Sequence, residues 1–212
     1  MGHRIITISR QYGSGGRNVG LKIANRYNME YFDKELLEEA AKKSGISKEL
    51  FEMHDEKPTS SFLFSMVSDG YFFGYPSVNS YGDMPISQRV FLAQFDTIKE
   101  IAKERSCVIV GRCADYALQG FDDVINVFVS ANMETRLKNV MEETGHTREK
   151  AKDLILKTDK RRSGYYNYYT NKKWGAAESY DLCVNSSIIG VDGCVETVVK
   201  FADLVAENKV KI

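Results

Sequence analysis

Short apolar runs alternate along the chain with longer segments whose apolar residues recur at helical spacing. The short runs predict strands, because a parallel strand that is covered on both faces is apolar nearly throughout. The predicted strands cover residues 5–9, 30–32, 107–110, 125–130 and 180–184. Strands that are separated by helices favour an α/β domain with a parallel sheet and right-handed crossovers.

Helical periodicity lies between and after these strands. The predicted helices cover residues 16–27, 87–104 and 133–143, followed by one that Thr147 caps and a last one that Asp192 caps. Threonine and aspartate suit this position because their side-chain oxygens accept hydrogen bonds from the free N–H groups of a first helical turn. The basic run at 159–162 is predicted to end the fourth helix, just before a tyrosine-rich stretch.

Residues 57–89 break this alternation. The segment contains all three prolines of the chain, several glycines and serines, and many aromatic residues. So long an irregular stretch inside a compact domain is usually functional or mobile. We predict an insertion outside the sheet of a single domain that spans residues 1–212. The insertion either packs its aromatic residues onto the body of the protein or a second copy, or covers the substrate.

Composition and charge argue against several classes of protein. Lys+Arg and Asp+Glu both number 29, so binding to nucleic acid through bulk phosphate attraction is not expected. The four cysteines form no C-x-x-C pair and predict reduced thiols of a cytoplasmic protein, not a disulfide framework or a zinc site. No apolar stretch is long enough to span a bilayer, so no membrane partner is expected. Both a monomer and a homodimer fit this composition.

A glycine-rich turn directly behind the first predicted strand carries the strongest chemical signal. Residues 9–17 read Ser-Arg-Gln-Tyr-Gly-Ser-Gly-Gly-Arg. The glycines let the backbone curl so that successive N–H groups point inward, and the helix that follows adds positive potential. This pattern predicts a binding site for a phosphate-bearing ligand. The residues predicted to bind it are Gly13, Ser14, Gly15, Gly16, Arg17 and Asn18.

The turn departs from the P-loop of nucleotide triphosphatases, G-x-x-x-x-G-K-S/T. When the second glycine of that motif is set on Gly16, Gln11 stands at its first glycine. Arg17 then replaces the lysine and Asn18 replaces the Ser/Thr, so no hydroxyl is ready for a magnesium ion. Arginine is longer and planar and is not interchangeable with lysine. A dinucleotide-binding turn is a second interpretation, with Asp33 as the ribose-binding acid, but its third glycine would fall on Asn18.

Charged residues at other element ends point to the same chemistry. Arg112 and Asp33 each follow a predicted strand, so both should emerge at the carboxyl edge of the sheet, where open α/β sheets bind ligands. Asp159 and Arg162 lie three positions apart and share one helical face. Arginines that neutralise a phosphate chain are what phosphoryl transfer requires. Each residue alone also has a simpler role, as an ion pair, a helix cap or a solvated helix end.

Together these segments resemble the cytidylate-kinase-like family of P-loop nucleoside-monophosphate kinases, in a form diverged from the cytidylate kinases proper. After the glycine turn the resemblance continues, in order, through residues 31–34 (Tyr-Phe-Asp-Lys), 108–115 (Val-Ile-Val-Gly-Arg-Cys-Ala-Asp), 159–162 (Asp-Lys-Arg-Arg) and 180–185 (Tyr-Asp-Leu-Cys-Val-Asn). It implies a three-layer α/β P-loop kinase fold whose five parallel strands have the order 2-3-1-4-5. It also implies a lid-like segment at about 158–175.

The resemblance further implies an activity. The related enzymes transfer the γ-phosphate of ATP to CMP or dCMP, so ATP and Mg²⁺ are the implied cofactors. The ion would be held mainly by phosphates and water, with no protein metal ligand. The glycine turn would wrap the ATP phosphates, while Asp33 and Arg112 would bind the acceptor nucleotide. The residues implied in catalysis are Arg17, Arg112, Arg136, Arg162 and Asp159.

Two functions therefore stay open. The first is ATP-dependent phosphoryl transfer to a nucleoside monophosphate, or to another phosphorylated small molecule. The second is a non-catalytic sensor or interaction protein that binds a nucleotide or phosphate with a degenerate P-loop. The second is favoured by Arg17 and Asn18 in the turn, and by Val110, which stands where an acidic residue would precede Gly111 and Arg112.

Overall fold

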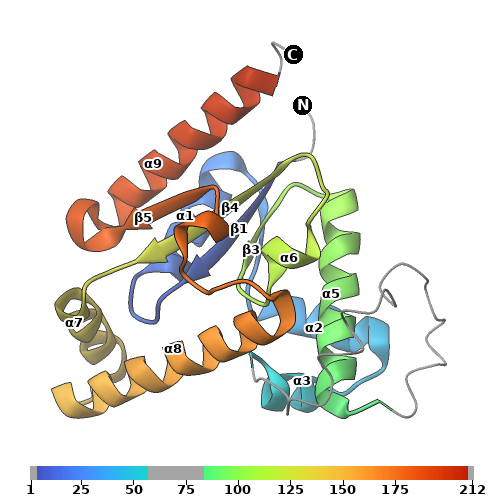
Figure 1. Cartoon of the computed structure of the whole chain (residues 1–212), viewed down its shortest axis with the longest axis horizontal. Coiled ribbons are helices and arrows are strands. Elements are labelled where there is room, and N and C mark those ends of the chain that lie inside the picture. The colour runs from blue at the N-terminus through green and yellow to red at the C-terminus, as the bar shows by residue number, and fades with distance from the viewer. Residues whose placement is uncertain (1–3, 57–83, 210–212) are drawn as a thin grey trace.

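The computed structural model describes residues 4–56 and 84–209, and its elements alternate as predicted (Figure 1). The sheet consists of β1 (Ile5–Arg10), β2 (Glu30–Phe32), β3 (Cys107–Val110), β4 (Val124–Ser130) and β5 (Leu182–Asn185). All neighbouring strands are parallel, in the order β2-β3-β1-β4-β5. The register pairs Ile5 of the central strand β1 with Cys107 on one side and Val124 on the other. The predicted sheet and its strand order are confirmed.

Helices cover both faces of this sheet. One face carries α1 (Gly16–Tyr27) and α9 (Ser186–Lys209), and the other carries α5 (Ile86–Glu104), α6 (Ala114–Ala117) and α8 (Arg148–Thr170). Outside this frame, α2 (Glu35–Ser44) and α3 (Lys48–His54) pack beside α5, and α7 (Met133–Thr144) packs on α8. A short 3-10 turn, η4 (Ala177–Ser179), precedes β5. The result is the three-layer α/β arrangement that the sequence predicts.

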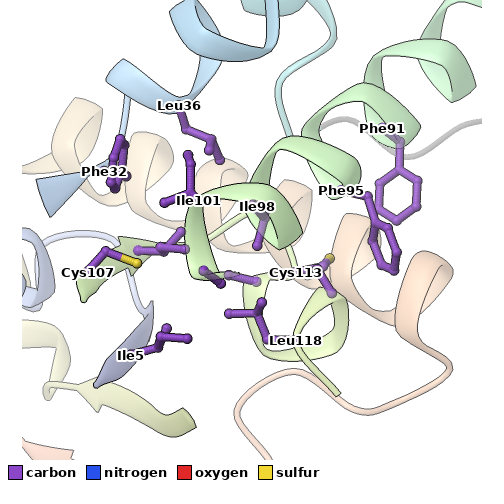
Figure 2. Packing of buried hydrophobic residues seen from close by; sticks show 14 of the residues in the cluster. Ile5, Phe32, Leu36, Phe91, Phe95, Ile98, Ile101, Cys107, Cys113 and Leu118 are labelled. Carbon is purple, nitrogen blue, oxygen red and sulfur yellow. The ribbon is translucent and has the colours of Figure 1, made fainter. Parts of the chain in front are cut away.

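Strand β3 shows why the central strands are apolar at every position. Cys107 and Ile109 point into the core beneath α5 and α8, whereas Val108 and Val110 point into the core beneath α1 and α9. All four side chains are fully buried, because successive residues of a strand face opposite sides of the sheet and both sides are covered. Figure 2 shows the first of these cores, where Cys107 lies near Ile5 and Ile101.

The fourth helix is longer than predicted. Thr147 caps it as expected, but α8 continues through the basic run at 159–162 and ends only at Thr170. The reason is packing, because Tyr165, Tyr166 and Tyr169 are buried on its inner face. The ring of Tyr169 stacks on Phe91 of α5 with centroids 3.8 Å apart. Residues 158–170 of the lid-like segment are therefore part of this helix.

Two other boundaries predicted from the sequence are also wrong. Strand β5 begins at Leu182 and not at residue 180, because Tyr180 lies against Phe128, with ring centroids 5.0 Å apart, before the strand starts. Helix α9 begins at Ser186 but is interrupted at Gly190, whose φ of 69° and ψ of 177° are not helical, so Asp192 lies in the first turn after this break and not at the cap position. Asp192 instead forms an ion pair with Lys22 of α1.

Part of the insertion predicted at 57–89 lies outside the described residues, namely 57–83. Its last residues are helical, because α5 begins at Ile86. All four cysteines are free thiols. Among the helices of residues 4–56 and 84–209, none has the length and apolar character needed to cross a bilayer.

Candidate functional site

The glycine turn connects β1 to α1 at the carboxyl edge of the sheet. Gly15 stands at the N-cap of α1 with φ 77°, a left-handed conformation that favours glycine. The N–H groups of the first helical turn have no intrahelical partner, and no side-chain hydrogen bond caps this helix in their place. Within the turn, the buried hydroxyl of Ser14 donates to the Gln11 carbonyl at 2.8 Å and so connects the two ends of residues 11–14. Open N–H groups at a helix N-terminus suit an anion.

Arg136 and Asp159 hold the backbone of this turn. The Tyr12 N–H donates to Asp159 Oδ1 at 2.8 Å, and Arg136 Nε donates to the Tyr12 carbonyl at 2.7 Å. The two side chains also pair with each other. Next to them, Asn139 Nδ2 donates to the Gly13 carbonyl at 2.8 Å. Arg136 and Asp159, two of the residues implied in catalysis, thus contact the backbone of the turn and fix its shape.

Asp33 and Arg112 meet at the ends of β2 and β3, as the sequence predicts. Arg112 Nη1 donates to Asp33 Oδ1 at 3.2 Å and to the Val110 carbonyl at 3.1 Å. On its other side, Asp33 Oδ2 lies 2.6 Å from Arg17 Nε. The side chain of Arg17 is 53% exposed, whereas that of Asp33 is 5% exposed, so Arg17 approaches the buried carboxylate from the solvent side.

Asp55, which was not predicted from the sequence, completes this group. Its carboxylate binds Arg112 with two bonds, Nε to Oδ1 and Nη2 to Oδ2, each 3.1 Å long. Burial raises the pKa of Asp55, although the positive charge of Arg112 opposes the shift. Arg112 and Cys113 both have left-handed φ angles, 54° and 56°. Such a conformation is costly for residues other than glycine, so the ion pairs of Arg112 help to hold the turn after β3.

A third group of ion-paired residues consists of Arg10, Glu56 and Arg162. Of these three, only Arg162 was predicted from the sequence. Arg10 ends β1, and its Nη1 lies 2.8 Å from Oε1 of Glu56. Arg162 Nε lies 3.1 Å from Oε2 of the same carboxylate, and its guanidinium lies over the Tyr12 ring. Burial would raise the pKa of Glu56, but the charges of Arg10, Arg162 and Arg112 outweigh burial and lower it. Glu56 is therefore an ionised carboxylate that bridges buried Arg10 and largely buried Arg162.

Of these missed residues, only Arg10 had a usable signal. It directly follows a predicted strand, as Arg112 does, and so belongs at the carboxyl edge. Asp55 and Glu56 lie outside every predicted element. Asn18, predicted to bind the ligand, is exposed on α1. Within the part of the chain that the structure describes, no group of three or more His, Cys, Asp or Glu residues is placed to hold a metal ion.

Comparisons with known proteins relate the chain to a family and to solved structures. The model of the "Cytidylate kinase-like family" matches residues 5–188. No curated protein matches the chain. The crystal structure of an uncharacterized protein from Eubacterium ventriosum ATCC 27560 is 30% identical, with a TM-score of 0.71, over 95% of this chain and 99% of that one.

A second solved structure is similar in fold alone. Shikimate kinase from Bacteroides thetaiotaomicron is 12% identical, with a TM-score of 0.50, over 94% of this chain and 98% of that one. The family model, by contrast, spans most of the chain and includes the glycine turn and all the charged groups described above. The chain therefore belongs to the cytidylate kinase-like family.

Proposed function

We propose that this chain is an ATP- and Mg²⁺-dependent phosphotransferase whose acceptor is a nucleoside monophosphate, with CMP or dCMP as first choice. The observation that carries the proposal is the position of the glycine turn. It lies at the same sheet edge as two buried arginines, Arg10 and Arg112, and next to Arg162, whose side chain is 10% exposed. Membership of the cytidylate kinase-like family supports a kinase-type function.

The charge pattern of the site fits phosphoryl transfer. Five arginines and four carboxylates form its ion pairs: Arg10, Arg17, Arg112, Arg136 and Arg162 with Asp33, Asp55, Glu56 and Asp159. The carboxylates hold the guanidiniums in place before any ligand binds. Preorganised positive groups in a site that excludes water stabilise the charge on a transferred phosphoryl group. No covalent intermediate with a protein side chain is then needed.

A triphosphate fits the described residues better than a metal ion bound by protein alone does. The first turn of α1 offers uncapped N–H groups, and buried Arg10 Nε has no hydrogen-bond partner among the described residues. In the proposal these groups bind the phosphates, and Mg²⁺ is held mainly by phosphates and water. Bound ATP supplies the phosphoryl group, and the chain orients it and excludes water from it.

The acceptor is proposed to bind beside Arg112, with Asp33 orienting its sugar or base. Arg112 already uses its donors on Asp33, Asp55 and the Val110 carbonyl. Of its two carboxylate partners Asp55 is the more accessible, because its side chain is 26% exposed against 5% for Asp33. The acceptor phosphate would therefore take the place of Asp55 on the guanidinium.

The test is a coupled assay of ADP release from ATP and Mg²⁺ over a panel of acceptors. CMP and dCMP should stimulate release above the ATP-only rate, and UMP should do so less. Shikimate serves as a comparison acceptor, because the structural neighbour from Bacteroides thetaiotaomicron is a shikimate kinase. Arg112→Ala should raise the acceptor KM while ATP binding stays largely intact. Equal loss of both ligands would indicate a folding defect or a misassigned residue.

The second candidate is a non-catalytic nucleotide or phosphate sensor. The observation that favours it is the composition of the turn, where Arg17 and Asn18 replace the P-loop lysine and hydroxyl. In that case ATP binds, and raises the melting temperature in a thermal-shift assay. No acceptor then raises ADP release above the ATP-only rate.

A further inference from the structure

Arg10 occupies a position at the glycine turn that two glycines leave open. A Cβ atom on Gly16 would lie 2.5 Å from Cβ of Arg10 and 3.1 Å from its Cγ, so a larger residue at the start of α1 would displace the arginine. A Cβ on Gly111 would collide with its guanidinium and would lie 2.7 Å from Oε1 of Glu56. The side chain thus extends from the end of β1, past the first residue of α1, to the turn after β3.

This guanidinium has a donor that the described residues do not use. Arg10 is 6% exposed, and its Nη1 pairs with Glu56. Its Nε is buried and has no hydrogen-bond partner in residues 4–56 and 84–209. Buried polar groups are nearly always paired, because an unpaired one loses its bonds to water without replacement. An anion seated on the glycine turn would supply the missing acceptor.

Glu56 already provides such an acceptor to two arginines at once. Oε1 binds Arg10 at 2.8 Å and Oε2 binds Arg162 at 3.1 Å. Burial, together with the neighbouring charge of Arg10, lowers the pKa of Arg162, so the two guanidiniums are close enough to repel each other. The Glu56 carboxylate between them offsets this repulsion. A phosphate could do the same, because guanidinium binds phosphate oxygens with the same fork of donors that it offers to a carboxylate.

We propose that Arg10, together with Arg162, binds a phosphoryl group of a nucleoside triphosphate, and that the Glu56 carboxylate competes with that phosphoryl group for the two guanidiniums. The inference rests on the proposed function and deepens it, because it identifies the cation that stands in for the absent P-loop lysine. It also assigns a role to Glu56, which limits affinity for the triphosphate.

This arrangement predicts effects of opposite sign. Removal of the negative charge of Glu56 frees both guanidiniums and strengthens binding. Removal of Arg10 takes away one of the two guanidiniums and weakens it. A purely structural network would behave differently, because loss of either partner would lower stability and leave the affinity of the folded protein unchanged.

The experiment is calorimetric titration of the full chain with inorganic tripolyphosphate and, separately, with ATP. Glu56→Gln should bind both ligands at least fivefold more tightly than the wild type. Arg10→Gln alone leaves the buried Glu56 carboxylate with Arg162 as its one ion-pair partner among the described residues and is expected to lower stability, so it is made together with Glu56→Gln. The double variant should bind at least tenfold more weakly than Glu56→Gln. Glu30→Gln, which breaks the exposed pair with Arg105 (2.8 Å) at the amino end of β2, should bind like the wild type.

Two results overturn the inference. One is a folded Glu56→Gln variant whose affinity equals or falls below that of the wild type, including the case in which neither protein binds tripolyphosphate or ATP. The other is a double variant that binds as tightly as Glu56→Gln. Failure of the proposed function looks different: the affinities change as expected, but no acceptor stimulates ADP release. Conversely, ADP release stimulated by an acceptor together with unchanged affinities refutes the inference alone.

Discussion

Replacement of Arg112 by methionine tests how strongly the ion pairs at the ends of β2 and β3 stabilise the fold. The side chain is 2% exposed and pairs with Asp33 and Asp55. Methionine has a similar length but no donor, so both carboxylates lose this partner. Removal of one partner from a buried ion pair costs about 3–5 kcal/mol. Because Asp33 keeps Arg17 and Asp55 is 26% exposed, we expect a loss near the lower end, about 3 kcal/mol.

Urea unfolding followed by circular dichroism measures this loss, with the m-value as a check that the same surface is exposed. A change of about 3 kcal/mol corresponds to a fall in Tm of roughly 6–12 °C for a chain of this size. Asp55→Asn is the matched control, because Arg112 keeps its bond to Asp33, and we expect it to lose only about 1 kcal/mol. An Arg112→Met variant within about 0.5 kcal/mol of the wild type, the range of ordinary surface substitutions, would refute the reasoning.

Three other predictions rest on single contacts. Gly16→Ala should lower the free energy of unfolding by about 1–3 kcal/mol, because its Cβ collides with Cβ of Arg10. Arg10→Gly removes that Cβ, and if thermal unfolding shows that the two changes are simply additive, the collision is not the cause. Burial raises the pKa of Asp115, although a hydrogen bond from Tyr166 opposes the shift. The native state then binds its proton at a higher pH than the unfolded chain does. Stability should therefore fall as pH rises from about 3.9 through the native pKa. Asp115→Asn should remove that slope in urea unfolding, and an unchanged slope would contradict the assignment. Arg17→Ala should weaken ATP binding by about 1.5–3 kcal/mol in calorimetry if its guanidinium bonds to a phosphate, whereas unchanged affinity would leave Arg17 only its pair with Asp33.

The sheet could be predicted because its strands are buried on both faces. A short, continuous apolar run such as 107–110 is typical of such a strand. The strand order came from the resemblance to a family and not from periodicity. The end of α8 could not be found in the same way. Tyr165 and Tyr169 follow a basic run that looks like a helix end, and only their packing on Phe91 extends the helix past it.

The site residues also fall into those that a local sequence pattern could place and those that it could not. Asp33 and Arg112 could be paired from the sequence because both follow strands, and the carboxyl ends of parallel strands share one edge. Glu56 could not, because its role depends on the end of α3 lying beside β1, and no local pattern encodes a contact between residues 46 positions apart. Long-range ion pairs of this kind emerge only from the tertiary structure.

The unbroken course of α8 determines which flank of the site can move (Figure 1). Arg162 lies over the glycine turn, while Tyr169, on the same helix, is wedged against Phe91. From Asp159 to Tyr169 the helix forms a rigid rod about 15 Å long, at about 1.5 Å per residue. To move the backbone of Arg162 away from the turn, the whole rod must tilt and pull an aromatic stack apart. The site therefore has a stiff wall at α8, whereas on another flank the side chain of Arg17 is open to solvent.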